Sequence, residues 1–173
     1  MKNPLIFKAC LFLTLFYSSI TGAGIYIALA PSWSKIDTPS ASTHPSLADF
    51  RLGYEIPNHQ LELAIMTSTK DDQLNQLTVD IPSVKSIFYR YVPNPKSDVK
   101  FHLILGASQI EVDSSYPGIA DSTDKFDGFS YGLGLEEAFR SIPNLKMKFD
   151  WISLYDGDQI TINTISLGLR YEF

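Results

Sequence analysis

Cysteine is nearly absent from this chain of 173 residues. The one cysteine, Cys10, lies within a segment that has the features of an export signal, so the rest of the chain can form no disulfide. An exported protein meets an oxidising compartment, yet this one has to fold without that cross-link. Lipid attachment at Cys10 is not expected either, because Lys8 stands two positions before it, where a lipoprotein signal is apolar.

Residues 1–23 have the three parts of a cleaved export signal. Lys2 and Lys8 form a basic start, residues 9–20 are largely apolar, and residues 21–23 are small. We predict cleavage after Ala23. The alternative, a retained membrane anchor, is disfavoured because the apolar part is too short and wrongly flanked for a transmembrane helix. Residues 24–173 then form a single domain.

Clustered basic residues are also missing. The chain has 14 Lys and Arg against 19 Asp and Glu, a formal charge of −5 and a pI near 5.1. Without Lys2 and Lys8, residues 24–173 carry a formal charge of −7. Binding to nucleic acid is therefore excluded, because neutralising phosphates requires grouped Lys and Arg side chains.

After residue 23 the sequence contains no apolar run of 18 residues. A transmembrane helix needs about 20 consecutive apolar residues, so residues 24–173 cannot cross a membrane as helices. The other structure that satisfies every backbone polar group inside lipid is a closed barrel of strands.

Alternation between apolar and polar residues is what the sequence does have, most clearly at its end. Ile165, Leu167, Leu169, Tyr171 and Phe173 fall on one face of an extended chain, and small or charged residues fall on the other. A period of two predicts a β-strand, whose apolar face has to be hidden from water. We expect lipid to cover it.

Eight such stretches follow residue 23, each bounded by turn-forming residues. The connections between them alternate long and short up to the last, which is short, a pattern typical of a membrane barrel with loops on one side and tight turns on the other. The sequence therefore predicts an all-β fold, an eight-stranded antiparallel up-and-down transmembrane β-barrel. We expect strands at about 24–30, 49–56, 60–68, 83–92, 99–112, 126–140, 145–155 and 160–173, with long polar loops at 31–48, 69–80 and 113–125.

Charged side chains of both signs share the face opposite the apolar one. A soluble ligand-binding barrel would show the reverse pattern, with polar side chains outside. The interior of an eight-stranded barrel is just wide enough for side chains, so we expect these charges to pair there and close the barrel. A narrow or gated pore is the alternative. The predicted interior network comprises Arg51, Glu55, Glu62, Arg90, Lys100, His102, Glu136, Lys146, Lys148, Asp150, Arg170 and Glu172.

Aromatic residues near the strand ends predict two girdles at the membrane interfaces. The girdle on the side of the tight turns would contain Tyr89, Tyr91, Phe139, Tyr171 and Phe173. The girdle on the loop side would contain Phe50, Phe126, Tyr155 and Trp33.

No catalytic, metal or cofactor site is predicted. Asp121, Asp124 and Asp127 are spaced by three residues, which differs from the alternate-position ligands of a calcium loop. His44 and Ser46 are the only close pairing of a base with a nucleophile, in a loop with nothing to fix their geometry.

The sequence resembles the small outer-membrane β-barrel family of Gram-negative bacteria, which includes the opacity proteins and the barrel of outer-membrane protein A. Residues 166–173 resemble the family's C-terminal strand with its terminal Phe, and residues 131–135 resemble its sixth strand. The resemblance implies an outer-membrane location and insertion by the β-barrel assembly machinery, which reads the terminal strand. Leu169, Tyr171 and Phe173 would then be the assembly signal.

Activities in this family are diverse and mostly non-catalytic. We therefore expect a monomer, surrounded by outer-membrane lipid, whose role is structural or is an adhesin-like or antigen-like contact with a host or surface ligand through the loops. The alternatives are a narrow pore or small-solute conduit and a lipid A-modifying enzyme.

Overall fold

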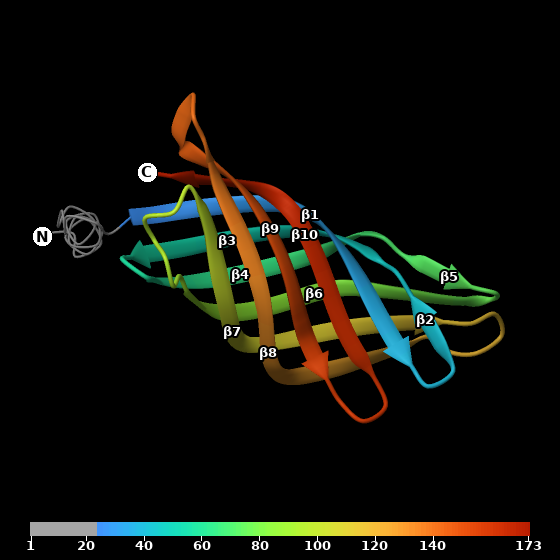
Figure 1. Ribbon diagram of the computed structural model, residues 1–173. Helices are drawn as coiled ribbons and strands as arrows, with labels where there is room; N and C mark the ends of the chain where they lie inside the picture. Colours follow the sequence, from blue (N-terminus) through green and yellow to red (C-terminus); the bar gives the residue numbers. More distant parts are fainter. Residues whose placement is uncertain (1–23) are drawn as a thin grey trace, which may run out of the picture.

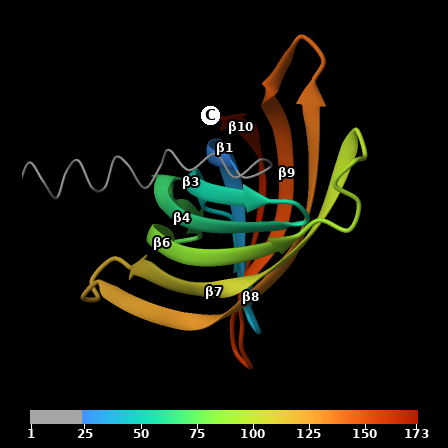
Figure 2. The same cartoon turned by 90° about the vertical axis from the view of Figure 1, so that its left-hand side faces the viewer.

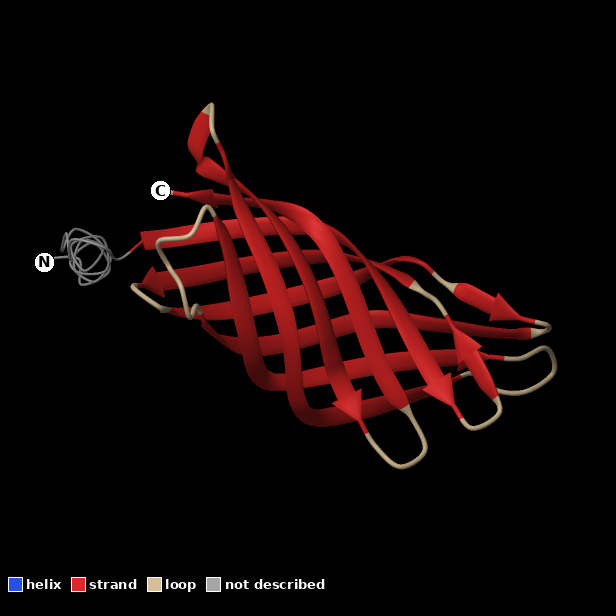
Figure 3. Ribbon diagram, viewed as in Figure 1, coloured by secondary structure: helices blue, strands red, loops and turns tan. Residues whose placement is uncertain are grey.

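Each long strand pairs with its sequence neighbours in the computed structural model, which describes residues 24–173 (Figures 1 and 3). The predicted export signal lies outside the described residues. Two short strands, β2 (Ala41–Thr43) and β5 (Asp72–Leu74), belong to hairpins at the loop end. The barrel wall consists of β1 (Gly24–Thr38), β3 (Ser46–Ile56), β4 (His59–Lys70), β6 (Leu77–Tyr91), β7 (Val99–Ser115), β8 (Ser122–Phe139), β9 (Ile142–Asp156) and β10 (Thr161–Glu172).

The last strand closes the sheet by pairing with the first. Leu169 of β10 lies opposite Leu29 of β1, and Ile165 lies opposite Trp33. Pairing between these strands skips Ala30 and Pro31, because proline has no N–H to donate. Gly168 faces this gap, where a Cβ atom would collide with the backbone of β1. All pairs are antiparallel, which confirms the predicted eight-stranded fold class.

The strands are longer at the loop end than predicted. The expected loop at 31–48 is mostly strand, since β1 runs to Thr38 and β3 begins at Ser46; β6 and β8 likewise begin at Leu77 and Ser122. The Ser and Thr residues of these segments suggested loops. They are compatible with strands here because the backbone ladder continues and the inward positions of these segments, such as Ile36, Leu47 and Val79, are buried in the barrel.

The tight turns, the start of the first strand and the end of the last strand all lie at the end of the barrel opposite the loops. Residues 57–58 join β3 to β4, with Asn58 in the left-handed region at φ 67°. The start of β1 and the end of β10 meet here, where the Phe173 N–H donates to the Ile25 carbonyl at 3.1 Å (Figure 1). The β8–β9 hairpin projects beyond the wall, because β9 begins at Ile142 instead of residue 145 (Figure 2).

The interior has two layers. Charged side chains fill the half nearer the turns, and an apolar cluster fills the half nearer the loops. The sequence analysis did not predict this apolar layer. Its buried members are Ile36, Leu47, Ala64, Met66, Val79, Ile81, Val84, Phe88, Ile104, Ile110, Val112, Ile152, Leu154 and Ile162.

Two predicted girdle residues belong to this layer instead. Phe126 and Tyr155 pack against the apolar cluster with ring centroids 5.3 Å apart, so their assignment to the lipid side was wrong. Phe126 has the inward parity of β8. In β9 a bulge at Leu154 leaves that residue without a partner on β10 and changes which face Tyr155 occupies.

The outer wall carries a band of exposed apolar side chains. Leu29, Leu63 and Phe129 are each more than half exposed, and the five residues of the predicted turn-side girdle are also exposed, as are Phe50 and Trp33. Residues 24–173 contain no helix with the length and hydrophobicity to span a membrane.

Candidate functional site

The structure places all twelve residues of the predicted interior network on the inward face of the barrel. Nine of them are buried, and Glu55, Lys100 and Glu172 are half-buried where the barrel opens at the turn end. A buried charge is costly unless it is paired, so the pairing decides whether this layer can be stable. The pairs form two clusters.

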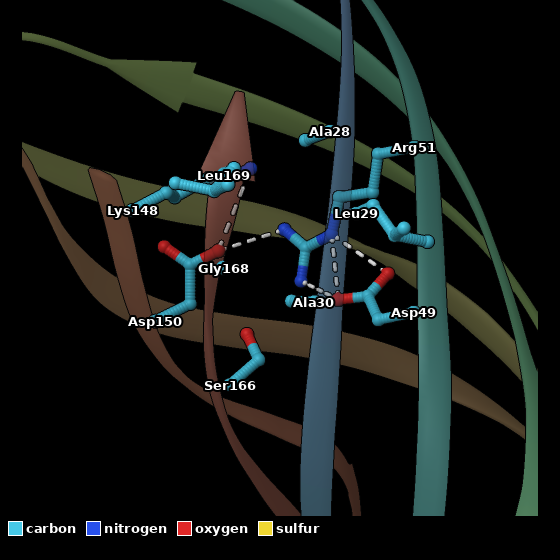
Figure 4. A pocket seen from close by; sticks show the side chains of 10 residues that line it. All are labelled: Ala28, Leu29, Ala30, Asp49, Arg51, Lys148, Asp150, Ser166, Gly168 and Leu169. Carbon is cyan, nitrogen blue, oxygen red and sulfur yellow. Dashed lines mark hydrogen bonds and ion pairs between the residues drawn. The ribbon is translucent and has the colours of Figure 1, made fainter. Parts of the chain in front are cut away.

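The first cluster surrounds Arg51 of β3. Its guanidinium lies 2.6 Å from Asp49 and 2.9 Å from Asp150 (Figure 4). It also lies 3.1 Å from Glu62. Arg90 adds contacts of 2.9 Å to Glu62 and 2.5 Å to Asp150. Lys148 lies 2.5 Å from Glu62, so three cations share three carboxylates contributed by β3, β4 and β9.

The second cluster surrounds Arg170 of β10, nearer the turn end. Arg170 lies 2.6 Å from Glu136 and 2.5 Å from Glu172, and it also pairs with Glu55. Lys146 contacts Glu172 at 2.6 Å and Glu136 at 3.4 Å. The His102 ring lies 3.9 Å from Glu136, and Lys100 lies 3.5 Å from Glu55.

Tyr26 of β1 connects the clusters. Its hydroxyl donates to Glu62 at 2.9 Å, and its ring faces the guanidinium of Arg170 at 3.6 Å. The ring can lie there because its partner in the register, Gly53 of β3, has no side chain, and a Cβ at Gly53 would collide with it. The cation therefore rests on the face of an aromatic ring.

The sequence analysis omitted Asp49 and Tyr26 from this network. Asp49 is two residues before Arg51 and therefore faces the same side of the strand, which could have placed it in the network. It was omitted because it stood at the predicted start of that strand. With Asp49 included, the interior holds six acidic side chains and six basic ones, so the network is electrically neutral. The acidic members are Asp49, Glu55, Glu62, Glu136, Asp150 and Glu172; the basic members are Arg51, Arg90, Lys100, Lys146, Lys148 and Arg170.

A ladder of hydroxyl groups runs through the apolar layer, with Phe88 and Ile104 on its turn side and Val84 and Ile110 on its loop side. Ser86, Ser108 and Ser130 are linked by contacts of 2.7 Å, and Ser130 donates to the Leu154 carbonyl at 2.9 Å. Beside Arg51 and Asp150 a cavity of about 10 Å³ remains. That volume is close to the space of a single water molecule, so this part of the interior is filled by side chains.

The loop end holds the net charge of residues 24–173. A polar hollow of about 800 Å³ opens between the ends of β4, β6, β7 and β8. Acidic residues outnumber basic ones around it. This end carries Asp37, Asp71, Asp72, Asp80, Glu111, Asp113, Asp121, Asp124, Asp127, Asp156 and Asp158 against Lys35, Lys70, Lys85 and Lys125.

Some of these charges are paired locally. Glu111 of β7 lies 2.8 Å from Lys125 of β8, and this contact lowers the pKa of Glu111 and raises the pKa of Lys125. A hydrogen bond from Ser42 lowers the pKa of Asp37, helped by Lys35 at 2.9 Å. These carboxylates remain charged at neutral pH.

The histidines are separated by the fold. The Nδ1 atom of His44 lies 4.0 Å from Asp72, too far for the hydrogen bond that orients a catalytic base. His59 lies at the turn end, 2.6 Å from the Tyr89 hydroxyl, and His102 lies in the interior. Within residues 24–173, no three His, Cys, Asp or Glu side chains are grouped so as to hold a metal ion.

Solved structures share this architecture at low sequence identity. The attachment invasion locus protein Ail of Yersinia pestis, solved with the heparin analogue sucrose octasulfate, is 17% identical with a TM-score of 0.67, over 88% of this chain and 100% of that one. Neisserial surface protein A is 16% identical with a TM-score of 0.62, over 88% and 99%. The N-terminal barrel of OprF from Pseudomonas aeruginosa is 14% identical with a TM-score of 0.62, over 87% and 97%.

Comparison with curated protein sequences finds no match. The family model of the outer membrane protein beta-barrel domain matches residues 11–173. The closed barrel, the exposed apolar wall and this match agree, and the chain belongs to the outer membrane protein beta-barrel domain family.

Proposed function

We propose that this outer-membrane barrel is a closed scaffold that acts at the cell surface through its loop end, in a structural or surface-interaction role. The observation that carries the proposal is the segregation of charge. The interior is neutral and tightly paired, while the loop end has eleven acidic side chains and four basic ones. Recognition commonly resides on loops held by a rigid scaffold.

The acidic loop end favours a cationic partner, such as a lysine-rich protein segment. Ail was solved with a sulfated sugar. A surface with seven excess negative charges would repel such a polyanion, so we do not carry that ligand over. The partner we propose is therefore of opposite charge.

A binding experiment can test this choice. The protein in nanodiscs should bind an immobilised lysine-rich peptide in a salt-sensitive manner and should not be retained on heparin. Replacing Asp71, Asp121 and Asp124 by Asn should weaken peptide binding. The control is Asp98→Asn, which removes an acidic group from the turn end and should have no effect. Retention on heparin, or an equal loss in the control, would contradict the proposal.

A narrow pore remains the second candidate, because polar hollows open at both ends of the barrel, about 800 Å³ at the loops and about 320 Å³ at the turns. The charged layer and the apolar layer lie between them. An apolar constriction opposes ion passage because water leaves it. Planar-bilayer recording should show no steady channels, and channels abolished by Glu136→Gln would establish the pore instead.

We propose that the protein has no enzymatic activity. The 4.0 Å separation of the His44 ring from Asp72 supports this. Lipid A from cells with and without the protein should give identical mass spectra, and a gained or lost acyl chain would overturn the proposal.

A further inference from the structure

The lipid-facing wall has a hollow on one side of the barrel. It lies over β4, β6, β7 and β8 and has a volume of about 840 Å³. Its floor is one row of paired outward residues, in which Leu63, Ile87, Ala107 and Phe129 follow one another across the four strands. Ala107 has the smallest side chain in this row, and the depression lies above it, between the larger side chains of Ile87 and Phe129.

The next outward row toward the loops is polar in three of its four positions. In the same strand order it consists of Ile65, Lys85, Gln109 and Asp127, all exposed. An apolar depression thus ends at a charged rim where the lipid-facing band ends. Such a boundary is the position of lipid headgroups.

Lys85 is the cation at this rim. Among the lysines of the loop end, Lys35 pairs with Asp37 and Lys125 pairs with Glu111, whereas in residues 24–173 no carboxylate lies within ion-pair distance of Lys85. Glu111 is near enough to interact with the Lys85 charge, but its ion pair is with Lys125. Asp127 is two strands away, roughly 10 Å, with Gln109 between them. The ammonium group and the neighbouring amide are therefore available to a ligand.

We propose that this hollow is a binding site for an anionic phospholipid of the outer leaflet, one whose phosphate is not neutralised by a cation of its own. An acyl chain lies over Ala107 between Ile87 and Phe129, and the phosphate contacts the Lys85 ammonium, with the Gln109 amide as a second donor. Charge complementarity favours this occupant, since an unpaired cation at a membrane interface attracts an anionic headgroup. The apolar floor fits a hydrocarbon chain. It does not fit a bound peptide, because its side chains offer no hydrogen-bond partner to a peptide backbone.

Native mass spectrometry of the protein released from nanodiscs can test the site. With phosphatidic acid and phosphatidylcholine in equal amounts, the wild-type protein should retain the anionic lipid in excess. Lys85→Gln should reduce this excess about fivefold, the effect of about 1 kcal/mol per surface lysine. Lys70→Gln is the control, because Lys70 also lacks an ion pair among residues 24–173 but lies at the rim of the loop-end hollow.

A second pair of variants tests the floor. Ala107→Leu fills the depression and should reduce retention of both lipids, whereas Ala48→Leu adds the same atoms to another part of the wall and should change nothing. All four positions are on the surface, so folding should be preserved, and heat-dependent gel mobility checks this. Unchanged retention in Lys85→Gln, equal losses in both lysine variants, or a dimer in place of bound lipid would overturn the proposal.

Discussion

Arg51 shows how single residues hold the charged layer together. Three carboxylates, from Asp49, Glu62 and Asp150, converge on its guanidinium, and all four groups are buried. A buried ion pair adds little stability compared with a well-packed apolar pair, but breaking one leaves a charge without a partner. The network is therefore sensitive to the loss of any member.

Replacing Arg51 with Met should destabilise the barrel by about 3–5 kcal/mol, because buried Asp49 loses its only ion pair among the described residues and Glu62 and Asp150 each lose one of three. Urea unfolding of the refolded protein in detergent micelles would measure the difference. Lys96→Met, in the exposed turn before β7, should stay within about 0.5 kcal/mol of the wild type. Equal stability of Arg51→Met and wild type would show that water enters and solvates the carboxylates.

Gly53→Ala should destabilise the barrel by about 1–3 kcal/mol, the usual range for overpacking. The new methyl group would displace the ring of Tyr26, which would lose its hydrogen bond to Glu62 and its contact with Arg170. The same unfolding measurement applies. Gly24→Ala is the matched control, because a Cβ there meets no atom within 4 Å. If Gly53→Ala causes no further loss of stability in a Tyr26→Ala background, the collision is established as the cause.

At the scale of the element, β10 has two roles. It closes the sheet against β1, and its inward Arg170 is the centre of the second charge cluster. Its outward residues Leu169 and Tyr171, with Phe173 directly after the strand, remain our predicted assembly signal. Phe173 is 74% exposed and contacts Tyr171 edge to face at 5.2 Å, so it contributes little to the interior.

Deleting Phe173 should lower the amount of protein in the outer membrane, because the assembly machinery would lose the terminal residue that it reads. Refolding of the purified variant in detergent should be close to normal, since the residue has few contacts with the barrel. Quantitative blotting of membrane fractions measures the first effect. Phe139→Ala removes an exposed aromatic residue at the same end and is the control. Normal membrane levels of the truncated protein would refute the signal.

For the whole molecule, the two interior layers explain how a barrel with twelve buried or half-buried charges can be closed. The charged layer is paired without net charge, and most of the interior between it and the loops is apolar. The net charge is displaced to the loop end. A neutral interior and an acidic loop end are what we expect of a rigid scaffold that presents one charged surface.

The closed barrel predicts a difference in gel mobility between boiled and unboiled protein in detergent. Folded membrane barrels keep their strand ladder under these conditions, because the closed sheet has no edge from which to unravel. Arg51→Met should shift the temperature of this transition downward. Identical mobility before and after boiling, with the protein in the soluble periplasmic fraction, would contradict the barrel.

Sequence alone determined the fold class, the facing of most strands and the membership of most of the charged layer. These follow from a period of two, which assigns each residue of a regular strand to one face before any contact is known. The two omissions, Asp49 and Tyr26, lay on inward positions of the predicted strands, but Asp49 stood at the start of its strand and Tyr26 is uncharged.

Tertiary structure decided the rest. The bulge at Leu154 turns Tyr155 inward, and parity cannot be followed through an extra residue that the sequence does not mark. The extension of β1, β6 and β8 depends on pairing with neighbours, which supports polar segments that look like loops. The apolar layer and the hollow over Ala107 depend on the stagger between strands, and only the closed sheet fixes that stagger.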